Sequence, residues 1–281
     1  MRIKLEEIAN RSGYSIATVS RVLSGKAKGR SQSVHDIIHT ARDLGYKASI
    51  NQYSNINIPV DIALVTQHDA EEFYSCLYES FDRIAAKMNI QISIHSAKHS
   101  KNLAEQIHLV SKFHDGIILM APTLVSEDYE KILKKTAAFP IVSIAPVDGN
   151  IFPTITFDSY EGGRLAGETA YGDISKKGLT KLGVFSSNDQ MALGFLHTAL
   201  DNGNRIPGDF GVIGYDNMPY SKVFYPKLST IGTDLDVLAE TTLDSLRTSV
   251  KSEKIKKQNS TTTLLPVEIV KRRTHANDET K

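Results

Sequence analysis

Residues 4–23 are the stretch that most narrows what this chain folds into, because they read as two short helices joined by a tight turn. Gly13 tolerates the left-handed backbone that ends a first helix over residues 5–12. Ser15 is suited to cap the second helix, since its hydroxyl accepts a backbone N–H that lacks a partner there. Apolar residues then recur at helical spacing, so we expect the second helix to bury Val19, Val22 and Leu23 and to expose its polar side.

A third helix is predicted over residues 32–44, where apolar residues form a stripe at helical spacing. Any small three-helix bundle shows such stripes, so charge has to separate the alternatives. Residues 1–50 hold nine Lys or Arg and four acids, a net charge of +5, whereas the whole chain carries +1. A basic N-terminal segment followed by a mildly acidic remainder indicates that the N-terminal segment binds phosphates, rather than being just any small helical bundle. We therefore interpret the second helix as the recognition helix of a helix-turn-helix that reads the DNA major groove.

Several motifs, taken in their order along the chain, resemble the LacI/GalR family of bacterial transcription repressors. They are T-V-S-R-V-L at 18–23, D-G-I-I-L at 115–119, F-D-S-Y-E-G-G-R-L-A at 157–166, F-S-S-N-D-Q-M-A-L-G at 185–194, R-I-P-G-D-F-G-V-I-G-Y-D-N at 205–217 and L-P-V-E-I-V-K-R at 265–272. The resemblance implies a DNA-binding head, a hinge and a periplasmic-binding-protein-like effector domain that dimerises.

The predicted architecture is α/β with an all-α head. The head spans residues 1–47, a polar hinge spans 48–59, and an effector and dimerisation domain spans 60–281. From residue 60 on, apolar strands alternate with amphipathic helices, which predicts a parallel sheet with helices on both faces. In a first lobe of about 60–157 we expect strands at 60–66, 90–95, 116–120 and 141–144, and helices at 73–88, 103–113 and 126–137, the last capped by Ser126.

The second lobe, about 158–281, is predicted to be reduced. Its expected pieces are helices at 162–171, 190–202 and 235–250, strands at 182–185 and 211–215, and a C-terminal strand. Compared with the family, about two βα units are missing before residue 185. A buried parallel strand that loses its neighbour is exposed unless it pairs again. We therefore expect a smaller sheet, and the alternative is a lobe that borrows a partner's edge.

The resemblance places the DNA contacts on the second helix and beside it. Arg21 is suited to donate two hydrogen bonds to a guanine, and Ile16 and Ala17 offer apolar contact to thymine methyls. The alternative is that Arg21 binds only phosphate. In the hinge, the family's wedging leucine is Asn55 here; Ile56 is the candidate substitute, although it would point about 100° away on an α-helix. The remaining candidates are Lys4, Ser15, Thr18, Ser20, Lys26, Lys28 and Tyr46.

An effector cleft between the lobes is also implied by the resemblance. Phe73 would stack on a sugar face, and Asp158, Asn188, Asp189 and Asp216 would bind hydroxyls. The alternative for Asp216 is that it only caps a turn. The arginine that clamps the ligand in the family falls in the missing segment, so ligand affinity is expected to be low or absent.

Other classes of protein fit the sequence less well. The start lacks the apolar run of a secretory signal, no stretch approaches a membrane span, and Cys76 is the only cysteine, so we expect a soluble cytoplasmic protein. His35 and His39 stand four residues apart as zinc ligands do, but no Cys or acid joins them; His95 and His99 also lack partners. We therefore expect no metal, no cofactor and no enzymatic activity.

The leading hypothesis is a sequence-specific repressor of sugar or carbohydrate genes. It would bind a pseudo-palindromic operator as a dimer, because one recognition helix reads too few base pairs to select a site in a genome. A small molecule, such as a sugar, would be the effector. One alternative is a shortened regulator that binds DNA without an effector switch, and another is a cytoplasmic small-molecule-binding protein with a vestigial head.

Overall fold

A computed structural model describes residues 3–24, 32–44, 46, 60–67, 72–136, 139–145, 149, 151–176, 182–251 and 261–275. The predictions for Lys26, Lys28, Ile56 and the hinge at 48–59 lie outside these residues. Within them, no helix is both long enough and apolar enough to cross a membrane.

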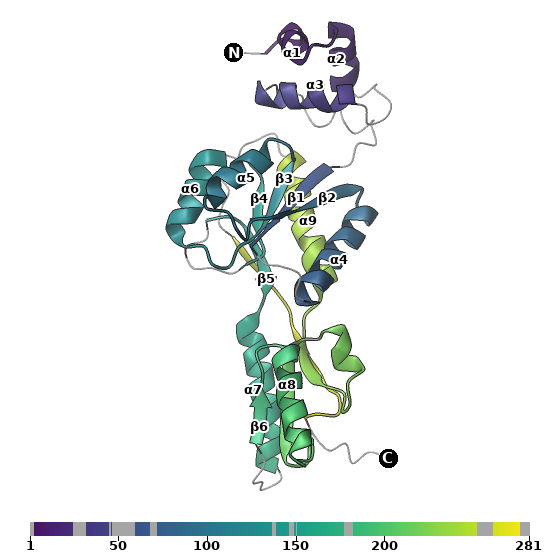
Figure 1. The fold of residues 1–281 in the computed structure, drawn as a ribbon, viewed down its shortest axis with the longest axis vertical. Coiled ribbons are helices and arrows are strands. Elements are labelled where there is room, and N and C mark those ends of the chain that lie inside the picture. The colour runs from purple at the N-terminus through teal and green to yellow at the C-terminus, as the bar shows by residue number, and fades with distance from the viewer. Residues whose placement is uncertain are drawn as a thin grey trace. The chain divides into compact units, whose positions relative to one another are not determined.

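The described part of the head contains three helices, as predicted: α1 (Leu5–Ser12), α2 (Ile16–Leu23) and α3 (Gln32–Asp43) (Figure 1). Their apolar faces meet in one core, in which Ile8, Val19 and Ile37 are completely buried. Gly13 ends α1 with a φ of +76°, and the Ser15 side chain accepts the backbone N–H of Thr18 at the start of α2. The predicted turn chemistry is therefore confirmed in the structure.

Among the residues that the structure describes, the first sheet has six strands in the order β2-β1-β3-β4-β5-β9. Neighbouring strands from β2 to β5 pair in parallel, as the alternation of strands and helices predicted. The strands are β1 (Val60–Thr66), β2 (Ile90–Ser96), β3 (Gly116–Met120), β4 (Ile141–Ser143), β5 (Thr154–Phe157) and β9 (Thr262–Leu265). Every residue of β3 is buried, which is typical of the centre of a parallel sheet.

Helices cover both faces of this sheet. On one face, α5 (Leu103–Ser111) and α6 (Ser126–Thr136) share a core with alternate residues of β1 and β3, such as Val65, Ile117 and Leu119. On the other face, a Cβ added at Gly116 would lie 3.1 Å from Leu246 of α9 (Leu235–Lys251). The prediction that Ser126 caps α6 is wrong, because Ser126 is already helical and the side chain of Asp128 accepts the preceding N–H, that of Val125.

Within the described ranges, the second sheet has four strands in the order β10-β8-β7-β6, as expected for a reduced second lobe. The strands are β6 (Leu182–Phe185), β7 (Phe210–Asp216), β8 (Ser229–Gly232) and β10 (Glu268–Val270), and the helices are α7 (Ser159–Lys176), α8 (Asp189–Asp201) and the short 3-10 helix η2 (Pro219–Lys222). Strands β6, β7 and β8 run parallel, and β10 runs antiparallel to β8. Strand β8 was not predicted from the sequence, because S-T-I-G is too short to show a period.

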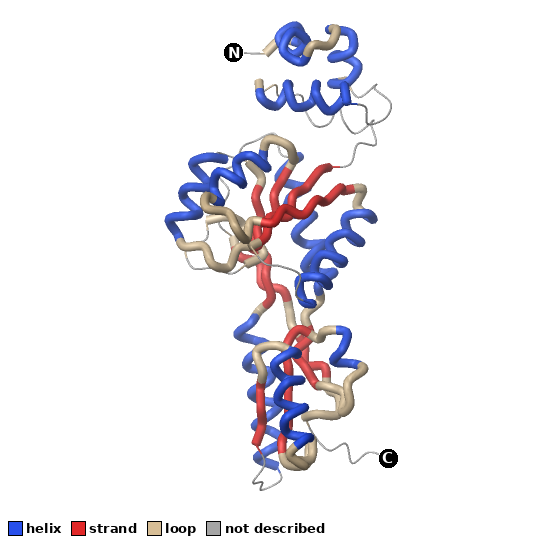
Figure 2. The backbone as a smooth tube through the Cα atoms, in the orientation of Figure 1, coloured by secondary structure: helices blue, strands red, loops and turns tan. Residues whose placement is uncertain are grey.

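Contacts divide the chain into two compact units that differ in two segments from the predicted lobes. The first sheet's unit includes Glu240–Thr261, which contains most of α9. The second sheet's unit includes Ala70–Phe81, which contains the first turns of α4 (Glu72–Lys87). Figure 2 shows helices lying beside the strands in both units. Polar residues that lie far apart in the sequence are therefore brought together within one unit.

Candidate DNA-reading surface and effector-side residues

The outer face of helix α2 is exposed to solvent, and its inner face is apolar and buried. Ile16 is 47% exposed, and Ala17 and Arg21 are exposed as well, whereas Val19, Val22 and Leu23 are buried. An isoleucine that is half exposed at the start of a short helix offers an apolar contact that the core of the head does not use. The three residues predicted to face DNA bases therefore share one accessible face.

Hydroxyl groups at the start of α2 are already ordered. The Ser15 Oγ accepts the Thr18 N–H at 3.1 Å and lies 2.8 Å from the Thr18 hydroxyl. Ser15 is exposed and Thr18 and Ser20 are half-buried. These contacts fix the first turn of α2, whose backbone N–H groups carry the positive end of the helix dipole, a favourable place for a phosphate.

Two tyrosines hold the head together in ways that the sequence did not reveal. The Tyr14 hydroxyl donates to the Asp36 carboxylate at 2.8 Å, which links the turn before α2 to α3. This hydrogen bond to a negative group raises the pKa of Tyr14. Tyr46 packs half-buried against the head core and its N–H donates to the Ala41 carbonyl, so its main contacts are internal. Lys4 is exposed just before α1.

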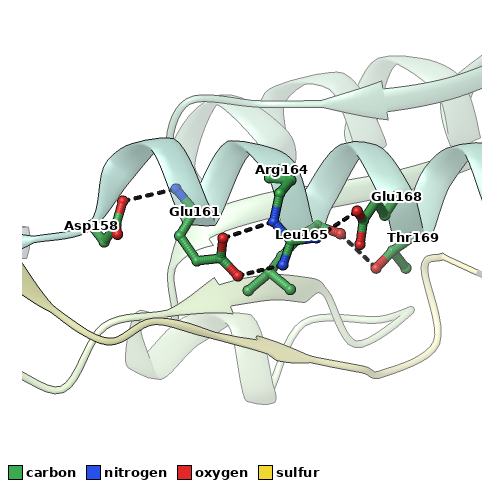
Figure 3. A network of polar contacts seen from close by, with 6 residues as sticks. All are labelled: Asp158, Glu161, Arg164, Leu165, Glu168 and Thr169. Carbon is green, nitrogen blue, oxygen red and sulfur yellow. Dashed lines mark hydrogen bonds and ion pairs between the residues drawn. The ribbon is translucent and has the colours of Figure 1, made fainter.

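The five predicted effector contacts all belong to the unit of the second sheet. Asp158 and Asn188 occupy equivalent places, each before a helix. The Asp158 carboxylate accepts the Glu161 N–H at 2.9 Å at the start of α7 (Figure 3), and the Asn188 side chain accepts the Met191 N–H at 2.8 Å at the start of α8. Both side chains are half-buried, and each keeps one polar atom besides the one used in capping.

Asp189 is an internal group in this structure, although the sequence suggested a ligand contact. It is completely buried, and its two oxygens accept hydrogen bonds from the Thr230 hydroxyl at 2.5 Å and the Met218 N–H at 2.7 Å. The cap formed by Asn188 directs the next side chain inward. Asp189 therefore joins the start of α8 to β8 and to the loop after β7.

Asp216 ends β7 with a φ of +97° and is half-buried. Burial and the nearby Asp189 raise the pKa of Asp216 to about 7. Burial likewise raises the pKa of Asp189 to about 6, even though the hydrogen bonds from Thr230 and Met218 and the nearby Arg272 act in the opposite direction. Because the two carboxyls are coupled, near neutral pH the pair shares protons that isolated carboxylates would have lost.

Arg272 organises the same region, although it was not among the site residues predicted from the sequence. One guanidinium nitrogen donates to the Ser221 hydroxyl at 2.9 Å and to the Leu228 carbonyl at 2.6 Å, and another donates to Asn217 at 2.5 Å. Arg272 stands within the quoted motif at 265–272, yet the partners of its guanidinium group are at least 44 residues away in sequence. No local pattern identifies such partners.

Two further predictions concern side chains outside this region. Phe73, on α4, is half-buried and its ring lies edge-on to that of Tyr74, with centroids 5.4 Å apart. The expectation that His95 lacks partners is wrong, because Ser93 lies 3.1 Å and His114 3.4 Å from its Nε2. In the part of the chain that the structure describes, no three His, Cys, Asp or Glu side chains are arranged to hold a metal ion.

Comparison with known proteins places this geometry among transcription regulators. The periplasmic binding protein-like domain family matches residues 108–275. Catabolite control protein A of Priestia megaterium is 22% identical over 82% of this chain and 87% of its own length. Among solved structures, the lac repressor dimer bound to operator and the anti-inducer ONPF aligns over 98% of this chain and all of its own, with a TM-score of 0.66 and 20% identity. A complex of the regulator CelR with cellobiose aligns over 97% and 100%, with a TM-score of 0.63 and 17% identity, which supports a common fold.

Proposed function

Because the chain belongs to the LacI/GalR family of transcription regulators and carries a periplasmic binding protein-like domain, we propose that it is a repressor that binds a pseudo-palindromic DNA operator as a homodimer. The observation that carries the proposal is the exposed face of α2, with Ile16, Ala17 and Arg21 above a closed apolar core. In the dimer, two such helices read two half-sites, which together specify enough base pairs to select one site.

The division of labour within the head follows from the chemistry of its side chains. Arg21 donates to the O6 and N7 atoms of a guanine, while Ile16 and Ala17 contact thymine methyls. Ser15, Thr18, Ser20 and Lys4 contact phosphates, with Lys26, Lys28, Tyr46 and Ile56 as further contacts toward the hinge. Since the head carries a net charge of +5, binding weakens steeply as salt rises.

Selection of operators from a random DNA pool tests this function. We expect enrichment of two inverted half-sites, and no enrichment would contradict sequence-specific binding. Arg21→Ala is expected to lose about 1–3 kcal/mol on the selected operator and to relax preference at one base pair. Lys4→Ala is the matched control, since loss of a phosphate contact weakens every sequence about equally. If Arg21→Ala lost the same binding free energy on all DNA sequences, Arg21 would contact only phosphate.

For the effector, we propose a small polyhydroxylated molecule such as a sugar. Asp158, Asn188 and Asp216 supply acceptors for its hydroxyls and Phe73 supplies a ring face, while Asp189 positions the start of α8 from inside. The relatives support this class of effector, since one regulator of the same fold was solved with cellobiose. Genes for carbohydrate use are the expected targets.

A regulator that binds DNA without an effector is the second candidate function. It is favoured by the short connection between α7 and β6, residues 177–181, which leaves no counterpart of the ligand-clamping arginine that the family resemblance implies. Thermal unfolding against a panel of sugars separates the two, because a ligand that binds only the folded chain raises the melting temperature. Operator binding without any such rise would favour the second candidate.

A further inference from the structure

We propose that β6 of one chain adds antiparallel to β6 of a second copy, so that the two four-stranded sheets join into one continuous sheet. The partner is a second copy because the proposed function already requires a homodimer, and only that choice rests on it. All residues that carry the argument lie within the unit of the second sheet.

Strand β6 is an edge strand with the composition of a central one. Its sequence L-G-V-F contains no charge and no proline, the usual devices that keep a sheet edge from pairing. Leu182 is 64% and Phe185 46% exposed, although parallel strands of this composition are normally buried on both faces. The structure therefore exposes at this edge what the missing βα units would cover.

The free edge also carries backbone groups that are ready to pair. The Ser186 N–H donates to the Ile213 carbonyl of β7 at 2.9 Å, so residue 186 is directed toward β7. Because successive residues of a strand point in opposite directions, Leu182 and Val184 are directed the same way. The N–H and C=O groups of Gly183 and Phe185 consequently point away from the sheet.

A two-fold axis at Val184 places these backbone groups opposite the same backbone groups of the second copy. Gly183 then pairs with Phe185 of the second copy, and each pair exchanges two hydrogen bonds, as opposed residues of antiparallel strands do. Since Gly183 has no side chain, it leaves room for the partner's aromatic ring. The two Val184 residues face each other across the axis, and no like charges meet within the strand pair.

The helices beside β6 support the same arrangement. With antiparallel strands, the two α7 helices lie antiparallel on one face, which opposes their helix dipoles favourably. Arg164 is paired with Glu161 and Glu168 of its own helix (Figure 3).

On the opposite face, α8 packs against Val184 and Val212. Its exposed residues between its two terminal aspartates form a stripe without charge, as the centre of a protein interface does. The residues of this stripe are Gln190, Met191, Gly194, His197, Thr198 and Leu200.

Sedimentation equilibrium of the full chain tests the proposal. We expect a dimer, and we expect Leu182→Lys with Phe185→Lys to weaken it by about 100-fold or more, because four lysines are then crowded into one short strand pair in place of apolar side chains. The matched control, Val223→Lys with Tyr225→Lys, adds the same charge to exposed apolar residues of the same unit and leaves the dimer unchanged. Thermal unfolding confirms that both variants fold.

A designed disulfide tests the pairing register of the two β6 strands directly. Directly opposed residues that do not share hydrogen bonds have Cβ atoms close enough for a disulfide, so oxidised Val184→Cys in a Cys76→Ser background should give a covalent dimer. Val223→Cys in the same background should not. A dimer that survives the lysines, a missing cross-link at 184 or a monomeric native chain overturns the proposal. Operator selection by the same protein shows separately whether the proposed function stands.

Discussion

Asp216→Asn should make the unit of the second sheet more stable, and increasingly so as the pH rises. In the folded chain, the pKa of Asp216 is about 7, against 3.8 for an isolated aspartate, because burial and Asp189 disfavour its charge. Asparagine has the same shape and stays neutral at every pH. The variant therefore removes the free-energy cost of ionising a half-buried carboxyl without emptying its place.

The size of the effect follows from proton linkage. Between about pH 4 and 7 the folded state holds this proton more tightly than the unfolded state, so the free energy of unfolding falls as pH rises through that window. A pKa raised from 3.8 to about 7 corresponds to an upper bound of about 4 kcal/mol. We expect the stabilisation by Asp216→Asn to grow from about zero at pH 4 to about 2–4 kcal/mol at pH 8, since the group keeps part of its hydration.

Hydrogen exchange of β7 and β8, compared with the native chain at the same pH, measures this difference for the unit concerned. Thr233→Val is the control, because it removes a 3.0 Å hydrogen bond to the Asp216 carbonyl without touching a titratable group. Its loss of about 0.5–1.5 kcal/mol should not depend on pH. A stabilisation by Asp216→Asn that stays constant from pH 4 to 8 would refute the reasoning.

Three more substitutions test the packing of the two regions. Ser15→Ala should cost the head about 1 kcal/mol, measured by the circular dichroism of its helices, because the Thr18 N–H loses its acceptor; an unchanged melting curve would contradict the cap. Gly214→Ala should destabilise the second unit by about 1–3 kcal/mol, since the new Cβ would lie 2.2 Å from an Asp189 oxygen, whereas Gly163→Ala, with open space around it, should stabilise α7 by about 0.5–1 kcal/mol in urea unfolding. Thr230→Val should raise the pKa of Asp189 further, because it removes a hydrogen bond that favours the charged form, and an unshifted carboxyl resonance in NMR titration would argue against that bond.

Local chemistry made most of the elements predictable. The helix start at Ser15 and the helix end at Gly13 depend on contacts within a few residues, and both predictions match the structure. The buried run of β3 is equally local, because its apolar residues are consecutive. By contrast, β8 is short and lacks a period, so it becomes a strand only through its pairing with β7 and β10.

The candidate effector residues show where local reasoning ends. Asn188 and Asp189 are adjacent and equally polar in the sequence, yet one caps α8 at the surface and the other is completely buried. That difference depends on Thr230, 41 residues away, and on the Met218 N–H. A motif match assigns both residues to a ligand, since it records identity and order but not the direction of a side chain.

By itself, the sequence determined the helical head, its basic charge and the alternation of strands and helices, because these follow from hydrogen bonds and apolar spacing within one or two turns. Only the tertiary structure decided that Asp189 and Asp216 share a buried region, that Arg272 braces it, and that β6 is left at an edge. Those outcomes depend on which distant segments exclude water from a group. Desolvation is a property of the packed chain rather than of any stretch of it.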